Sequence, residues 1–365
     1  MPDTSPLTTA DALAHMQTLP PGATLLLLGA PDTGKTTWAA AAVRALLESG
    51  KTVAVLDCDL GQSEIGPPGT VGAALAEPKG EAPPRALRDL SPLALYFVGA
   101  TSPARHALDW CVGACQMARV AKKRRPDLLL VDTCGWTQGA AAVTAKRRLC
   151  ELLLPHAVYA FTRGAELNPL LHAFAHLSAP TLHRIAPSPE VGRKTPAARS
   201  TRRAARFLSA LDGAREITLP WDAVALLGTR LGSGDPLPRH IQQFIGTTLR
   251  LPTLHAETLP GGEVYAVVNG ERWDASGLAA LEGHFHTSAV TVVPAQRFAG
   301  LYVGLVSASG ALLDIGLLAR LDFDARTITL RTPCRRPAAI AQVWCGTLRL
   351  RPDGRERGDL RPGEI

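Results

Sequence analysis

The stretch that decides the fold is Thr24-Leu25-Leu26-Leu27-Leu28-Gly29-Ala30-Pro31-Asp32-Thr33-Gly34-Lys35-Thr36-Thr37. Its apolar beginning predicts a buried strand, and the next eight residues fit the pattern G-x-x-x-x-G-K-[ST]. Glycines let the backbone wrap around a triphosphate, and successive N–H groups plus a helix N-terminus form the anion site. The residues predicted to hold ATP or another NTP are Gly29, Ala30, Pro31, Asp32, Thr33, Gly34, Lys35, Thr36 and Thr37.

Short apolar segments alternate with longer helical stretches from Thr24 to about Thr218. The apolar segments lack polar alternation, as is typical of a parallel sheet covered on both faces. This pattern predicts an α/β fold, a P-loop NTPase parallel sheet flanked by helices. The expected strands are Thr24–Leu28, Val53–Asp57, Leu95–Val98, Leu128–Asp132, Ala157–Phe161 and Thr181–Ile185. The expected helices are Lys35–Ser49, Pro103–Ala121 and Ala140–Leu154.

Helical periodicity fades after about Leu219, and hairpin signals replace it. Turns are expected at Asn269-Gly270, at Ser307–Gly310 and at Asp324-Ala325-Arg326. The sequence thus predicts an N-terminal P-loop domain at residues 1–218 and a smaller β-rich C-terminal domain at residues 219–365.

The amino-acid composition excludes several classes of protein. The chain has 365 residues, of which 46% are hydrophobic and 19% charged, so it can bury a core and is not disordered. Its longest apolar runs fall far short of the roughly 20 residues that span a bilayer, which predicts no membrane partner. The N-terminus lacks a secretory signal, and seven cysteines are an odd number for a disulfide framework, so a cytoplasmic location is expected.

A second motif ends the segment Leu128–Asp132. An aspartate at the end of a hydrophobic strand is typical of the residue that holds Mg²⁺ in P-loop proteins, so Thr36 and Asp132 are predicted Mg²⁺ ligands. The run Asp132-Thr133-Cys134-Gly135 also fits the D-x-x-G element of GTPases. The chain has only two asparagines, and neither begins the N-K-x-D element that reads guanine, which disfavours a GTPase.

Two carboxylates, Asp57 and Asp59, follow the second predicted strand at the edge where open α/β sheets bind ligands. A carboxylate there can accept a proton from an attacking hydroxyl or help to hold the metal ion. Period-2 geometry places both on one side of an extended strand, so spacing does not choose between them.

Basic residues dominate residues 191–211, the segment that we interpret as a lid. On a helix starting near Pro196, four arginines occupy positions i, i+3, i+4 and i+7 and therefore share one face. Like charges at these spacings oppose the helix, so an anion is expected against that face. The basic residues are Arg193, Lys194, Arg199, Arg202, Arg203 and Arg206. The runs Lys122–Arg125 and Lys146–Arg148, in contrast, are interpreted as solvated helix ends.

Several blocks together resemble the polynucleotide 5′-hydroxyl kinases, the P-loop RNA kinases of tRNA splicing, mRNA 3′-end cleavage and pre-rRNA processing. The blocks are Asp59-Leu60-Gly61-Gln62, Pro67-Pro68-Gly69-Thr70, Phe97–Pro103 and Asp132–Trp136, with Phe298–Leu305 similar to part of the family's C-terminal domain. The resemblance covers about residues 24–350.

The resemblance implies roles for individual residues. Lys35 and Thr36 would contact phosphate and Mg²⁺, Asp59 would be the general base, and Gln62 and Trp136 would contact the terminal nucleotide. Stacking of a base on an aromatic ring contributes about 1–3 kcal/mol. Arg193, Arg199, Arg202 and Arg206 correspond to the family's lid.

These observations predict a kinase that transfers the γ-phosphate of ATP, with Mg²⁺, to the 5′-hydroxyl end of RNA or DNA. Protein partners are not predicted. Two alternatives remain at this point, a P-loop kinase of a small hydroxyl compound and a non-catalytic, ATP-gated RNA-binding or scaffold protein.

Overall fold

A seven-stranded sheet forms the centre of the first of two compact units, Met1–Ala210 and Leu211–Ile365. The computed structural model describes residues 7–78, 83–174, 177–187 and 191–365. The strand order is β4-β3-β2-β5-β1-β6-β7, and every pair is parallel except the two that β3 makes with β2 and β4. The strands are β1 (Ala23–Gly29), β2 (Val53–Cys58), β3 (Thr70–Ala76), β4 (Pro92–Phe97), β5 (Leu128–Thr133), β6 (Ala157–Phe161) and β7 (Thr181–Ile185).

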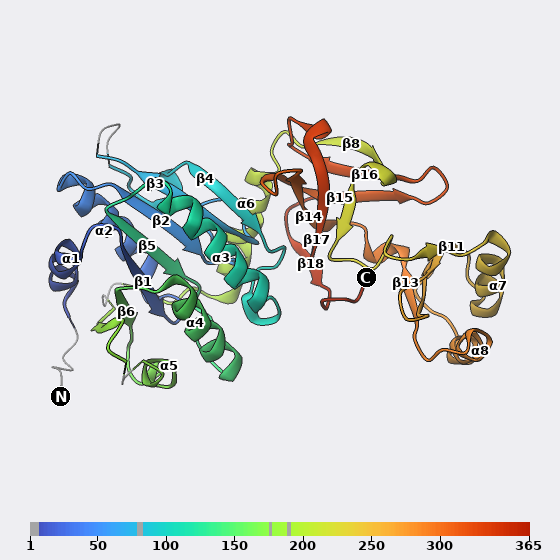
Figure 1. Cartoon of the computed structure of the whole chain (residues 1–365), viewed down its shortest axis with the longest axis horizontal. Coiled ribbons are helices and arrows are strands. Elements are labelled where there is room, and N and C mark those ends of the chain that lie inside the picture. Colours follow the sequence, from blue (N-terminus) through green and yellow to red (C-terminus); the bar gives the residue numbers. More distant parts are fainter. Residues whose placement is uncertain (1–6, 79–82, 175–176, 188–190) are drawn as a thin grey trace. The chain divides into compact units, whose positions relative to one another are not determined.

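Helices cover both faces of this sheet. Because side chains alternate along a strand, Leu26 and Leu28 of β1 pack with α3 and α4, whereas Leu25 and Leu27 pack with α1 and α2. Figure 1 shows α3 and α4 in front of the sheet. The helices are α1 (Thr9–Thr18), α2 (Lys35–Glu48), α3 (Ala107–Lys122), α4 (Ala140–Leu153), α5 (Asn168–His172) and α6 (Pro196–Ala210). The predicted α/β class and its covered sheet are confirmed.

Three of the strands and α-helices described in the first unit were not predicted, namely β3, α1 and the short α5. Strand β3 consists largely of small residues, because the chain passes very close to it: a Cβ on Gly72 would lie 2.2 Å from the carbonyl oxygen of Ile65. Helix α1 begins with a capping box between Thr8 and Asp11, a short signal that the sequence analysis did not use.

The second unit contains two sheets. A largely antiparallel one has the order β18-β17-β14-β15-β16-β8, with β9 beside β17, and a four-stranded one has the order β10-β11-β12-β13. The predicted turns at Ser307–Gly310 and at Asp324–Arg326 join antiparallel strands as expected. The strands are β8 (Arg215–Pro220), β9 (Ala225–Leu227), β10 (Asp235–Pro236), β11 (Thr253–Thr258), β12 (Val264–Val268), β13 (Val290–Pro294), β14 (Leu301–Ser307), β15 (Leu312–Asp322), β16 (Thr327–Thr332), β17 (Ile340–Leu350) and β18 (Glu356–Asp359).

The predicted hairpin at Asn269-Gly270 is wrong. Strand β12 leads instead into helix α8 (Ala275–Phe285) and then into β13, which is parallel to β12. A parallel pair needs such a crossover, whereas a two-residue turn can join only antiparallel strands. Helix α7 (Arg239–Leu249) was also missed, and the expected domain boundary after residue 218 falls inside β8, a strand of the second unit.

None of the helices in the described ranges is both long and apolar enough to span a membrane.

The close approach at β3 generates a stability prediction. Gly72→Ala should lower the free energy of unfolding by about 1–3 kcal/mol, because its methyl group would overlap the backbone of Ile65. Gly283→Ala in α8 is the control, since no heavy atom lies within 4 Å of that Cβ and alanine favours a helix. Urea unfolding followed by circular dichroism measures both. An unchanged midpoint for Gly72→Ala would contradict the packing described.

Candidate active site

Four strand ends meet at one edge of the first sheet. Neighbouring strands β2, β5, β1 and β6 are parallel, so their carboxyl ends and the loops that follow lie together. This edge carries the P-loop after β1, Asp57 and Asp59 at the end of β2, Asp132 in β5 and Arg163 after β6. The fold thus brings together residues from four distant parts of the sequence.

The P-loop (Gly29–Thr36) joins β1 to α2, as predicted. Gly34 adopts a φ of +86° at the N-terminus of α2, a conformation that favours glycine. The buried Lys35 donates from Nζ to the carbonyl oxygens of Gly29 and Ala30, both at 2.9 Å. Burial lowers the pKa of Lys35, and the carboxylates of Asp132 and Asp59 oppose this effect. All three charges therefore lie close together.

Thr36 and Asp132 form the second part of the site. The Thr36 hydroxyl donates to Asp132 Oδ2 at 2.6 Å, while the buried Oδ1 of Asp132 has no hydrogen-bond partner among the described residues. Burial raises the pKa of Asp132 to about 6, and the charge of Lys35 opposes the rise. A hydroxyl beside a carboxylate oxygen with an unused lone pair is a donor set that suits Mg²⁺.

The segment after β5 lies directly against the P-loop. A Cβ on Gly135 would come within 2.6 Å of the backbone nitrogen of Pro31, so only glycine fits there. The next residue, Trp136, is half-buried and packs against the apolar cluster between the sheet and α3 and α4.

The structure distinguishes the two carboxylates that spacing left equivalent. Asp57 is buried, and its Oδ2 accepts hydrogen bonds from the backbone N–H groups of Glu64 at 2.6 Å and Ile65 at 2.9 Å. It therefore shapes the β2–β3 loop (residues 59–69). Burial, followed by the charge of Asp132, raises the pKa of Asp57 to about 7.

Asp59 is only half-buried. Its Oδ1 accepts hydrogen bonds from the N–H groups of Gly61 and Gln62, at 3.0 and 2.9 Å, and its Oδ2 makes none with the described residues. Its charge opposes the effect of burial on Lys35 and contributes to the raised pKa of Asp132. Of the two carboxylates, Asp59 has the oxygen that is available to a substrate.

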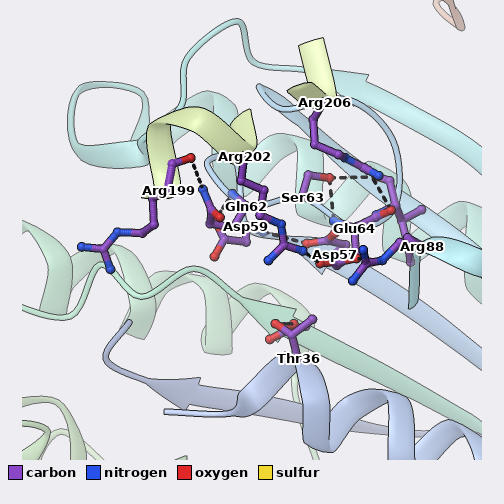
Figure 2. Close-up of polar contacts among 12 residues, drawn as sticks. Thr36, Asp57, Asp59, Gln62, Ser63, Glu64, Arg88, Arg199, Arg202 and Arg206 are labelled. Carbon is purple, nitrogen blue, oxygen red and sulfur yellow. Dashed lines mark hydrogen bonds and ion pairs between the residues drawn. The ribbon is translucent and has the colours of Figure 1, made fainter. Parts of the chain in front are cut away.

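Helix α6, the predicted lid helix, contacts this edge through its arginines. Arg199 Nη1 donates to Asp32 Oδ2 of the P-loop at 2.9 Å, and Gln62 Nε2 lies 3.4 Å from the carbonyl oxygen of Arg199. Arg202 and Arg206 contact the β2–β3 loop instead of the P-loop, as Figure 2 shows. Arg193, in the segment before α6, is exposed and makes no hydrogen bond with the described residues.

Three residues of the site were missed. Arg163 donates from Nη2 to the carbonyl oxygens of Asp32, at 2.6 Å, and Val191, at 3.1 Å, and so ties the P-loop to the segment before α6. Its position just after a predicted strand was an available signal. Glu64 binds Arg88 and Arg202.

The third is Lys146, and the interpretation of Lys146–Arg148 as a solvated helix end is wrong for it. Lys146 is fully buried, donates to the carbonyl oxygen of Cys134 at 2.8 Å, and lies over the ring of Trp110. Its spacing from Ala142 and Leu149 places it on the buried face of α4.

Known proteins resemble this chain. A family model described as the mRNA cleavage and polyadenylation factor CLP1 P-loop matches residues 29–211. The chain belongs to this family.

Individual proteins also resemble the chain over nearly its whole length. A polyribonucleotide 5′-hydroxyl kinase of Pyrococcus horikoshii is 26% identical, covering 96% of this chain and 92% of its own. A kinase of the same name from Thermococcus kodakarensis is 28% identical, covering 94% and 92%. The solved structure of a Clp1p–Pcf11p complex shares the fold with a TM-score of 0.58 at 11% identity, over 93% of this chain and 78% of the other.

The raised pKa of Asp132 predicts a pH-dependent stability. Its value of about 6 exceeds the ordinary 3.8, so between these pH values the folded chain binds more protons than the unfolded chain. The free energy of unfolding therefore falls as pH rises through this window. Asp132→Asn removes the effect, so at pH 7 the variant should be more stable than wild type, by about 1–3 kcal/mol.

The measurement is urea unfolding of both chains, without nucleotide, between pH 4 and pH 7. The decisive result is that the difference in free energy of unfolding between the two chains grows with pH. A changed hydrogen bond to Thr36 would shift this difference by the same amount at every pH. A difference that stays constant across this range would contradict the assigned burial of the Asp132 charge.

Proposed function

We propose that the chain is a polyribonucleotide 5′-hydroxyl kinase, which transfers the γ-phosphate of ATP to the 5′-hydroxyl end of RNA. The observation that carries this proposal is the position of Asp59, whose carboxylate shares one charged site with Lys35 and Asp132 beside α6. The archaeal relatives that carry this name match over about nine-tenths of their length and support the proposal.

The P-loop and its neighbours bind the triphosphate. Backbone N–H groups of the loop and the N-terminus of α2 face the phosphates, and Lys35 exchanges its carbonyl acceptors for β- and γ-phosphate oxygens. Mg²⁺, when bound by Thr36 and Asp132, neutralises charge on these phosphates. Asp59, whose charge acts on both Lys35 and Asp132, would help to hold the same metal ion.

Asp59 acts as the general base. Its Oδ1 is held by two backbone N–H groups, which orients Oδ2 towards the acceptor. The 5′-hydroxyl oxygen attacks the γ-phosphorus while its proton passes to Asp59, and the bond from phosphorus to the β–γ bridging oxygen breaks to release ADP. Asp57 cannot take this role, because its oxygens are buried and occupied by the β2–β3 loop.

Three groups position the substrates. Arg199, which already contacts the P-loop, adds positive charge beside the transferring phosphate. The buried Oε1 of Gln62 makes no hydrogen bond with the described residues and can accept one from the terminal ribose. Trp136 offers its partly exposed ring to the terminal base, and the exposed Arg193 contacts the backbone phosphate of the RNA.

The assay for this function uses γ-labelled ATP with matched 5′-hydroxyl RNA and DNA oligonucleotides. Wild type should label the RNA, Lys35→Ala and Asp59→Asn should each lower the rate by about 100-fold or more, and 5′-phosphorylated oligonucleotides should stay unlabelled. Thermal unfolding of each variant checks that it is folded.

Other outcomes identify the alternatives. Binding of ATP and RNA without labelling would indicate a non-catalytic RNA-binding protein, and phosphorylation of a small alcohol alone would indicate a small-molecule kinase. A wild-type rate for Asp59→Asn would rule out the assigned base.

A further inference from the structure

The carboxylate of Glu64 lies between two arginines from different elements. Its Oε2 is 2.9 Å from Arg88 Nε in the 3₁₀ helix η1 (Leu87–Asp89), and its Oε1 contacts Arg202 Nη2 in α6. The Glu64 side chain is only 6% exposed. Because the Glu64 carboxylate itself is buried, losing a partner would leave its charge less well compensated, so this group connects the β2–β3 loop to α6.

The backbone around Glu64 makes the same connection. Arg206 Nη2 donates to the carbonyl oxygens of Glu64 at 3.0 Å and Gly66 at 2.8 Å, while the N–H of Glu64 donates to Asp57. The connection therefore runs from the end of β2 through the loop into α6. Because Asp57 Oδ1 also accepts a hydrogen bond from the N–H of Asp59, the same carboxylate orients the proposed base.

Arg199 differs from Arg202 and Arg206 of α6. Figure 2 shows its side chain pointing away from the Glu64 cluster, whereas Arg202 and Arg206 point towards it. Arg199 reaches Asp32 of the P-loop, and its carbonyl oxygen lies next to Gln62 Nε2. Arg199 thus faces the phosphate-binding loop, while Arg202 and Arg206 are engaged by the β2–β3 loop.

We propose that Glu64 is a positioning residue that fixes α6 to the β2–β3 loop, with Arg202 and Arg206 as anchors, so that Arg199, rather than either anchor, acts on the transferring phosphate. The inference rests on the proposed kinase function and revises the expectation that an anion lies against the whole arginine face of α6. It also explains how several arginines can share one face of α6, because the negative charge of Glu64 offsets the repulsion between their side chains.

The anchoring has a kinetic consequence. Asp59 and Arg199 belong to one connected body, so their separation is fixed before the acceptor binds. Loss of the anchor should mainly reduce the alignment reached in the transition state, which lowers kcat and leaves the KM for ATP nearly unchanged.

A double-mutant cycle tests the proposal. Glu64→Gln, Arg202→Gln and the double variant are compared for kcat and for the KM of ATP and of 5′-hydroxyl RNA. Anchoring predicts that each single change lowers kcat by about tenfold and that the double variant is no slower than the slower single one. The exposed ion pair Arg148–Glu151 on α4 is the matched control, and its two Gln variants should leave kcat unchanged.

Two kinetic results would overturn the proposal. If Arg202→Gln is far slower than Glu64→Gln and their effects multiply, Arg202 acts on the phosphate itself. The cycle compares wild type, the two single variants and the double variant. If their effects are coupled in thermal unfolding but not in kcat, the ion pair is purely structural. An inactive wild type would instead refute the kinase function, so the two failures are distinguishable.

A further variant decides the case should Glu64→Gln fail to fold. Arg202 is partly exposed, and Arg202→Lys keeps a charge that can pair with Glu64. Anchoring predicts a kcat within about threefold of wild type for Arg202→Lys, whereas a guanidinium that grips phosphate oxygens would not be replaced by lysine. A loss as large as that of Arg202→Gln would contradict the anchor.

Discussion

Buried charge is the constraint on which the site depends. Lys35, Lys146, Asp57 and Asp132 are all almost inaccessible to water, at the edge of a sheet whose strands are apolar on both faces. Burial without partners would be prohibitive, so each of the four groups is hydrogen-bonded to one of the loops that form the site. These hydrogen bonds thereby hold the loops in one conformation, which local preferences of the loop residues alone would not do.

The sequence predicted the parts of the fold that depend on local pattern. The P-loop, the helix starting at Pro196 and the continuously apolar strands follow from periodicity and turn chemistry. Strand β3 could not be recognised, since its small residues reflect the close passage of Ile65 rather than any preference for a strand. Helix α8 was missed because Asn269-Gly270 was interpreted as a hairpin turn, whereas β12 and β13 are parallel and need a crossover between them.

The candidate site likewise has parts that the sequence predicts and parts that only the structure reveals. Strand ends located Asp57, Asp59 and Asp132 correctly at one edge, but only burial and hydrogen bonds separate the shaping carboxylate from the available one. The charge of the sequence was the least informative predictor of the site. The excess of basic residues, 39 against 32, lies entirely in the first unit, because residues 211–365 contain equal numbers of each sign. Within that unit a lysine can still be buried, as Lys146 is, or exposed.

The contact between Gly135 and Pro31 constrains how the sequences of these two segments can vary. The segment after β5 and the P-loop are far apart in the chain, yet residue 135 cannot gain a Cβ without displacing Pro31. The two segments should therefore change together among homologues, and a chimera that inherits one of them from a distant relative should inherit the other as well.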